Sequence, residues 1–387
     1  MAQDSAELAA RMKAMEERIL ALEAEVRSLK GQPPAAAAAQ AESPVQTQAP
    51  VNLGCAGGAG AKVLNPDIAV IGDFLGASGN SAGRPTPALE MHESEVGLQA
   101  ILDPYARADF FISFGEAGVN LEEGYLTFPA LPGGFQLRAG KMRAAFGKVN
   151  TLHNHALSWT DRPLVTRNLA GGEDGINDAG LSLSRILAGP KQIFLEGTAQ
   201  IFRGDSEDLF RSYRRSNVST VGHLRAYRDI TESTNLDLGV SYSRGHSVLG
   251  PDAINQLYGV DATVRWKPLR RSIYHSFIGR SEFIWSRLDQ SSLSVTPFGY
   301  YISGDYQFAR RWFVGGRFDR SDSLPVVQLN PLIVRDTGGS LVVTYWPSEF
   351  SQIRGQLRRT RYGDNLTANE FLFQFQFSIG AHGAHSF

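Results

Sequence analysis

Alternation of apolar and polar residues in runs of about ten dominates residues 62–387 and restricts the folds open to this chain. In one run Phe371, Phe373, Phe375 and Phe377 occupy alternate positions, with Gln374 and Gln376 between them. Such a strand turns one face to an apolar environment and the other to water. About ten residues is also the length that a tilted strand needs to cross a bilayer. The pattern predicts an all-β transmembrane barrel.

Sixteen such runs can be placed along the chain, an even number, as is typical of closed antiparallel barrels. They fall at 66–75, 91–102, 105–115, 119–130, 135–146, 179–187, 191–202, 219–228, 234–244, 256–266, 273–286, 295–308, 311–320, 338–346, 350–360 and 369–380. Short turns alternate with mostly longer connections, which predicts an outer-membrane barrel with both termini on the periplasmic side. A large soluble β-sandwich or propeller is the alternative, but it would not need aromatic residues opposite the charges in nearly every strand.

The first part of the chain, residues 1–31, carries apolar residues at alternating spacings of four and three. The seam consists of Leu8, Met12, Met15, Ile19, Leu22, Val26 and Leu29. Two apolar positions in seven form the narrow stripe of an α-helical coiled coil rather than the broader face of a helix packed on a domain. Ile and Val at one seam position with Leu at the other favour a dimer, whereas two successive Arg-apolar-x-x-apolar-Glu segments favour a trimer. We predict a homotrimer with its coiled coil in the periplasm.

Residues 32–61 separate these two parts. Residues 32–50 are rich in Ala, Gln and Pro and contain almost no bulky apolar residue, so they cannot bury enough surface to fold. The predicted organisation is a coiled-coil helix at 1–31, an extended Pro/Ala-rich linker at 32–61, and a barrel at 62–387 with a constriction loop at 147–178.

Composition excludes several other classes of protein. The formal net charge of −1 argues against a nucleic-acid partner. A single cysteine, Cys55, excludes a disulfide framework and a Cys-based zinc site. No run approaches 18 apolar residues, so no transmembrane helix is predicted. The segment Met1–Asp4 has no charged or apolar region of a signal peptide, as expected if a signal has already been removed.

One region breaks the alternation and resembles a known family. Residues 138–147 read RAGKMRAAFG, the following loop contains Asp161-Arg162, and the next strand opens with Asp178-Ala179-Gly180. These features resemble the phosphate-selective porin O/P family of sixteen-stranded outer-membrane proteins. The resemblance implies a trimeric pore in the outer membrane of a Gram-negative-type bacterium, with a third loop that folds into the barrel and narrows it. A loop of about thirty residues in a compact barrel is itself unusual and usually functional.

Charged residues that face inward by strand parity, or that lie at the expected constriction, are the candidate pore-lining residues. They are Arg138, Lys141, Arg143, Lys148, His153, His155, Asp161, Arg162, Arg107, Arg225, Arg265, Arg280, Arg317 and Arg354. Inward acids are about as numerous and lysine is sparse, which favours a general pore for small solutes or ions, with a mild anion preference, over a phosphate-specific one. Arg138 has no acid two positions away on its strand, whereas Arg265 and Arg280 have acids on the same face. We expect Arg138 and Arg143 to affect ion preference more than Arg265.

The remaining motifs predict no catalytic, cofactor or metal site. His153 and His155 could bind a metal ion if a carboxylate joined them, but spacing identifies no third ligand, so a polar lining role is favoured. No serine has an obvious His/Asp context, so the protein is not predicted to be an enzyme. A barrel hydrolase, whose catalytic residues lie on several strands, is the alternative that the sequence leaves open. A TonB-dependent receptor would need 22 strands and a plug domain, for which 387 residues leave no room.

Two further partners are predicted from the ends of the chain. Phe387, an aromatic residue that closes an alternating strand, looks like the signal by which the barrel-assembly machinery recognises its substrates. The coiled coil and linker could reach toward the cell wall, so an envelope tether anchored in the lipid bilayer by its barrel is the alternative function.

Overall fold

The computed structural model describes residues 66–81, 87–115, 118–190, 192–206, 208–290, 293–323, 333–363 and 365–380. The predicted coiled coil, the linker at 32–61 and Phe387 lie outside these residues. Within the described part, no helix combines the length and the hydropathy needed to span a bilayer.

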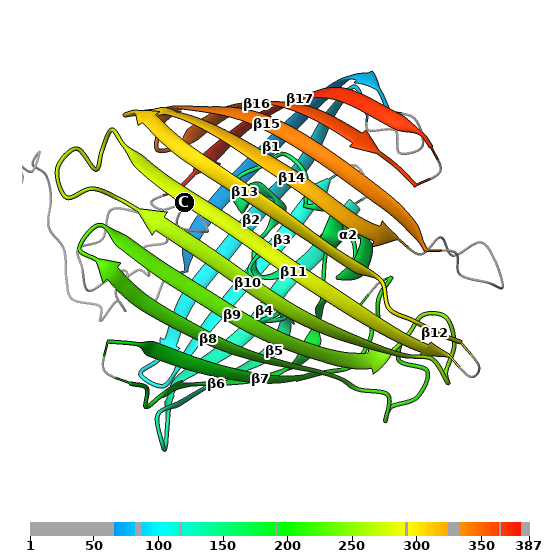
Figure 1. Ribbon diagram of the computed structural model, residues 1–387. Coiled ribbons are helices and arrows are strands. Elements are labelled where there is room, and N and C mark those ends of the chain that lie inside the picture. The colour runs from blue at the N-terminus through cyan, green and yellow to red at the C-terminus, as the bar shows by residue number, and fades with distance from the viewer. Residues whose placement is uncertain are drawn as a thin grey trace, which may run out of the picture. The chain divides into compact units, whose positions relative to one another are not determined.

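The strands form one antiparallel sheet that closes on itself (Figure 1). They are β1 (Asp67–Asn80), β2 (Leu89–Asp103), β3 (Ala106–Gly115), β4 (Gly118–Leu131), β5 (Phe135–Arg143), β6 (Asn177–Leu187), β7 (Phe194–Phe202), β8 (Ser219–Thr231), β9 (Thr234–His246), β10 (Ile254–Trp266), β11 (Ser276–Gln290), β12 (Leu293–Val295), β13 (Phe298–Ala309), β14 (Trp312–Ser323), β15 (Val334–Ser348), β16 (Ser351–Arg361) and β17 (Thr367–Ile379). Pairing of β1 with β17 closes the sheet. Because β12 and β13 both pair with β11, they are two pieces of one barrel strand, and the predicted closed barrel of sixteen strands is confirmed.

The two faces of the barrel wall differ in polarity as the alternation predicts. On β9, Leu238, Val240 and Tyr242 are exposed on the outside, whereas Asp237 and Ser241 are buried on the inside. The same apolar outer face recurs on the other strands, and it is the arrangement of a lipid-facing barrel. The closed sheet excludes the soluble β-sandwich and the propeller.

The link of residues 116–117 between β3 and β4 is short, on the side where the other connections are longer, as the predicted runs 105–115 and 119–130 imply. One connection differs from its predicted form, because residues 267–275 between β10 and β11 form a longer turn than the predicted Lys267-Pro268. There Arg271 adopts a left-handed conformation with φ 69°, and its carbonyl accepts hydrogen bonds from the backbone N–H groups of Tyr274 and His275. The apolar residues Ile273 and Tyr274 therefore belong to a turn although their composition suits a strand.

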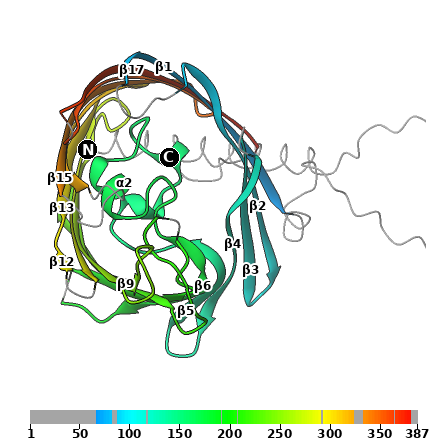
Figure 2. The same ribbon diagram turned by 90° about the vertical axis from the view of Figure 1, so that its right-hand side faces the viewer.

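The connection between β5 and β6, residues 144–176, folds into the barrel and is called the inward segment here. It contains two short 3-10 helices, η1 (Val149–Thr151) and η2 (Asn154–Ala156), and one short helix, α2 (Leu164–Leu169). Figure 2 shows α2 within the ring of strands, and α2 packs against β11, β13, β14 and β15. Its bounds differ slightly from the predicted loop because β6 already begins at Asn177.

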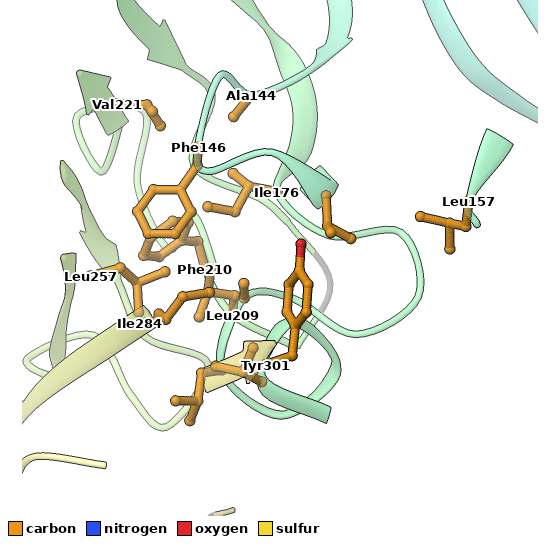
Figure 3. Packing of buried hydrophobic residues seen from close by; sticks show 14 of the residues in the cluster. Ala144, Phe146, Leu157, Ile176, Leu209, Phe210, Val221, Leu257, Ile284 and Tyr301 are labelled. Atoms are coloured by element: carbon orange, nitrogen blue, oxygen red, sulfur yellow. The ribbon is translucent and has the colours of Figure 1, made fainter. Parts of the chain in front are cut away.

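A hydrophobic core fixes the inward segment to the wall (Figure 3). Phe146 and Trp159 of the segment pack in one cluster with Leu257 of β10, Ile284 of β11 and Tyr301 of β13. All five side chains are at most 2% exposed. Full burial of one large apolar side chain contributes about 1.5–3 kcal/mol. The segment is therefore packed as a folded unit inside the barrel and does not lie there as a free loop.

Candidate pore constriction

The inward segment enters and leaves the wall at adjacent points. The backbone N–H of Ala144 donates to the carbonyl of Ile176 at 2.8 Å. Gly147, Gly171 and Gly172 have φ values of 60°, 91° and 72°, so the chain reverses at all three positions. A Cβ atom at Gly147 would lie 2.9 Å from Oε1 of Glu282, so a larger residue would require this carboxylate to shift, in addition to the strain of the left-handed backbone.

The first anchor of the segment is an ion-pair cluster around Asp161, called the Asp161 latch. Its carboxylate Oδ2 lies 2.8 Å from Nη2 of Arg317 on β14 and 2.9 Å from Nη1 of Arg358 on β16. Burial alone would raise the pKa of Asp161, but the two guanidinium groups hold it well below the usual range. Asp319 and Glu370 pair with the other sides of Arg317 and Arg358, at 2.7 and 2.6 Å. The latch thus joins the segment to the wall opposite its origin.

Arg162, the next residue, serves the interior of the segment. Its guanidinium donates to Oδ1 of Asn154 at 2.8 Å and to the carbonyl of Leu152 at 2.7 Å. Burial, together with the nearby charge of Arg143, lowers the pKa of Arg162 to about 9. The two neighbouring residues Asp161 and Arg162 therefore have different partners. Asp161 binds the barrel wall, whereas Arg162 binds other residues of the inward segment.

The second anchor lies at the start of the segment. Glu282 on β11 accepts hydrogen bonds from the backbone N–H groups of Lys148 and Val149, the latter at 2.8 Å. The Lys148 ammonium reaches Asp237 of β9 at 3.0 Å, and Asp237 also pairs with Arg225 at 2.8 Å. Lys148 is thus a partly neutralised lining charge.

The third anchor joins the segment to β2 and β4 through a buried group that we call the carboxylate–histidine cluster. Its members are Glu93, Glu95, Glu122, Glu123, His153 and His155. Nδ1 of His153 lies 2.6 Å from Oε2 of Glu95, and Nε2 lies 2.8 Å from Oε2 of Glu123. Burial would lower the pKa of His153, but the surrounding carboxylates raise it well above its ordinary value. Arg143 borders the cluster, with its guanidinium 3.0 Å from Glu122.

Sequence reasoning did not identify Glu122 and Glu123 as inward residues. Phe111 pairs with Glu123 and Ile112 with Leu121, so Glu122 is the extra residue of a β-bulge. The bulge turns two consecutive glutamates toward the interior, where both are buried. The doublet itself was a usable signal, because strict alternation would place one glutamate against lipid.

The described residues line two cavities beside the inward segment. One, of about 340 Å³, is lined by the charged residues Arg138, Arg143, Lys148, Arg225, Glu123, Glu196, Asp237 and Asp261. The other, of about 450 Å³, is lined by Arg162, Arg167, Arg358, Glu90, Asp161 and Glu173. Each lining contains as many acids as arginines and lysines. Both cavities are thus polar spaces with balanced formal charge.

Most predicted lining arginines have an acidic partner. Arg107 lies 2.6 Å from Asp109, whereas the guanidinium of Arg354 donates to the amide oxygen of Gln374 at 2.7 Å. Lys141 donates to the carbonyl of Leu121 at 2.6 Å. Arg143 is buried, so a substitution there would report on folding as well as on ion preference.

Arg265, Arg280 and Arg138 differ in how they are neutralised. Arg280 pairs with Asp305 and Arg265 approaches Asp237 at 3.7 Å, so their partners come from neighbouring strands and not from the same strand. Arg138 is exposed, makes no ion pair with any residue that the structure describes, and has its guanidinium 5.3 Å from the centre of the Tyr125 ring.

Comparison with known proteins supports the fold. No family model matches the chain. An uncharacterized protein of Aquifex aeolicus (strain VF5) is 28% identical, over 84% of this chain and 81% of that protein. Similar structures include an anion-selective porin from Comamonas acidovorans, with a TM-score of 0.57, 12% identity and coverage of 81% of this chain and 99% of that one. OprB of Pseudomonas putida gives a TM-score of 0.58 and 11% identity, covering 82% of this chain and 94% of that one.

A third similar structure is the outer membrane channel DcaP of Acinetobacter baumannii, with a TM-score of 0.54, 12% identity and coverage of 81% and 96%. At these identities the likeness shows a shared fold. The chain therefore has the closed sixteen-stranded barrel of the outer-membrane porins. Membership of the phosphate-selective family stays a prediction.

Proposed function

We propose that this protein is a non-enzymatic outer-membrane porin, whose water-filled channel lets small hydrophilic solutes or ions diffuse passively. The observation that carries the proposal is the inward segment. It is held inside a closed barrel by three separate anchors, and polar, charge-lined cavities lie beside it. A rigid segment that narrows an otherwise wide barrel acts as a size filter. Single-channel recording in planar bilayers tests this, and absence of any channel would contradict it.

A mild anion preference is part of this proposal, and Arg138 is its main determinant. Because the formal charges that line the cavities balance, preference depends on which charges are exposed and unpaired. Fixed charge acts most strongly where a passage is narrow. Arg138→Glu should therefore shift the reversal potential in a salt gradient toward cation selectivity. Arg265→Glu, which changes an arginine close to Asp237, is the matched control and should shift it little. Cation selectivity in the unmodified protein would contradict the assignment.

Assembly as a trimer is also proposed, on the heptad seam of residues 1–31 and the two Arg-apolar-x-x-apolar-Glu segments. Mass measurement of the full chain in mild detergent should give three copies, and a monomer alone would contradict this. The same seam favours the second candidate function, an envelope tether to the cell wall. Deletion of residues 1–50 separates the two, since a porin keeps its conductance whereas a tether loses its effect on the cell envelope.

A further inference from the structure

The carboxylate–histidine cluster brings together side chains from three segments that are distant in sequence. β2 and β4 each contribute two glutamates, and the inward segment contributes both histidines. All six residues are buried. The nitrogen and oxygen atoms of Glu95, His153 and His155 lie within 4.8 Å of one another, as do the carboxylate oxygens of Glu93, Glu95 and Glu122. Glu95 belongs to both groups and supplies the third ligand that sequence spacing did not reveal.

The cluster contains more negative charge than its neighbours balance. Of its four carboxylates, Glu122 pairs with the guanidinium of Arg143, and Arg162 adds a more distant positive charge. With all four carboxylates ionised, two negative charges remain, and a proton held by His153 among them is one that a bound metal ion would displace. In addition, Oε2 of Glu93 is buried and accepts no hydrogen bond from a donor group of the described residues, and the polar neighbour of Glu93 is another carboxyl group, that of Glu122. Glu93 as a whole is 6% exposed. A buried carboxylate oxygen without a hydrogen bond is costly unless it interacts with a cation. A divalent cation would balance the remaining charge.

The distances suit a metal ion with nitrogen and oxygen ligands. Nδ1 of His153 lies 2.6 Å from Oε2 of Glu95 and 2.9 Å from Oε2 of Glu122, and Nδ1 of His155 lies 3.7 Å from the same Glu95 oxygen. In a tetrahedral zinc site, bonds of about 2.0–2.1 Å place the ligand atoms about 3.3–3.4 Å apart. The observed separations fall on both sides of this value, so small shifts of the carboxylates would make room for the ion.

The second nitrogen of His153 already has the support that metal-binding histidines usually show. Its Nε2 lies 2.8 Å from Oε2 of Glu123, and the other oxygen of Glu123 accepts the backbone N–H of Arg143 at 2.7 Å. A carboxylate on the far side of an imidazole fixes the ring orientation and raises its basicity as a ligand. Glu123 of the cluster lines the cavity of about 340 Å³, and Asn154, which follows His153 in the chain, lines that of about 450 Å³.

We propose that His153, His155, Glu95 and Glu122 bind one divalent transition-metal ion, of the Zn²⁺ type, where the inward segment meets β2 and β4. Two imidazoles and two carboxylates suit Zn²⁺ better than Mg²⁺ or Ca²⁺, which prefer oxygen ligands alone. Glu93 balances charge beside the ion, and Glu123 positions His153. The ion clamps the inward segment to the wall nearest its origin. Metal binding is measured without any transport assay. Its result therefore tests the metal site independently of the proposed channel function.

The test uses the full chain in detergent, treated with a chelator, equilibrated with Zn²⁺ and then passed through a desalting column. The unmodified chain should retain one Zn²⁺ per chain, and His155→Gln should lose it. Glu123→Gln, which keeps all four ligands, should weaken binding about 10- to 100-fold. His246→Gln is the matched control, because His246 of β9 bonds to Asn217 away from the cluster, and it should retain the ion.

Two results would overturn the proposal. One is failure of the unmodified chain to retain Zn²⁺, which does not depend on how any variant folds. The other is equal retention by His155→Gln and His246→Gln. Substitution with Co²⁺ gives a second readout, because a tetrahedral site of nitrogen and oxygen ligands should produce intense visible absorption. That absorption should be absent in His155→Gln, and its persistence there would place the metal elsewhere.

Discussion

Removal of most of the inward segment should raise the single-channel conductance several-fold. Residues 145–175 can be replaced by a short Gly-Ser linker, because the backbones of Ala144 and Ile176 already share a hydrogen bond of 2.8 Å. The reason for the rise is geometric, since this segment fills part of the cross-section of the barrel and α2 packs on the opposite strands (Figure 2). Recording in planar bilayers measures the change. A conductance equal to that of the unmodified protein would contradict the constriction role.

The deletion needs a control for the general effect of shortening a loop. Pro251 and Asp252 are exposed residues in the connection between β9 and β10, and they lie outside the inward segment. A chain that lacks these two residues should conduct like the unmodified protein. The deletion also leaves Tyr301 and Ile284 facing water, so the barrel should unfold at lower denaturant concentration even where conductance rises.

Asp161→Asn should release the inward segment from the far wall. Removal of this carboxylate leaves the buried Arg317 and the half-buried Arg358 with one acid each, Asp319 and Glu370. Loss of one partner from a buried ion pair typically costs about 3–5 kcal/mol. The amide of Ala170, which is hydrogen-bonded to the carbonyl of Thr166 at the end of α2, should exchange with solvent much faster, and single-channel currents should become noisier.

Glu173→Gln is the matched control for the Asp161 latch. Glu173 lies on the same segment, but it is exposed and its contact with Arg167 spans 3.4 Å. An exposed pair of this kind contributes about 0–1 kcal/mol, so exchange at Ala170 should change little. Equal effects of the two variants would show that the latch does not hold the segment.

The latch also predicts how the segment responds to acid. The pKa of Asp161 is lower in the folded chain than its unfolded value of about 3.9. The ionised carboxylate of Asp161 therefore stabilises the folded chain fully above that unfolded value. This stabilisation is lost as the pH falls through the pKa of the folded chain. Arg317 and Arg358, which face it, stay charged throughout. Protection of the Ala170 amide should persist from pH 7 to about pH 4, and loss within this range would contradict the role of Asp161.

The wall of the barrel could be predicted from the sequence, because its determinant is local. Each strand shows its lipid-facing and interior sides in alternate residues, and the sixteen runs correspond to the sixteen barrel strands. The Arg271 turn was missed since Ile273 and Tyr274 have the composition of a strand, and a single left-handed residue determines the reversal. The β-bulge at Glu122 was missed for a related reason. One added residue changes which face of the sheet each later residue of the strand points to.

The interior could be predicted only in part, because its contacts join residues that are distant in the sequence. Parity placed Arg317 inside, and the resemblance pointed to Asp161 and Arg162. No spacing rule shows that Asp161 meets Arg317 and Arg358, or that His153 meets Glu95 and Glu123. Neutralisation of Arg280 was expected along its own strand, whereas Asp305 of the adjacent strand provides it. These pairings depend on the path of the inward segment through three dimensions.

The placement of the anchors has a consequence for the closure of the barrel. The inward segment is bound to β2 and β4 through the carboxylate–histidine cluster and to β11 through Glu282. The Asp161 latch depends on Arg317 of β14 and Arg358 of β16. A sheet that β14 and β16 have not yet joined can therefore hold the segment by two of its three anchors. The segment takes its final position, and the interior its final width, only when these two strands complete the wall.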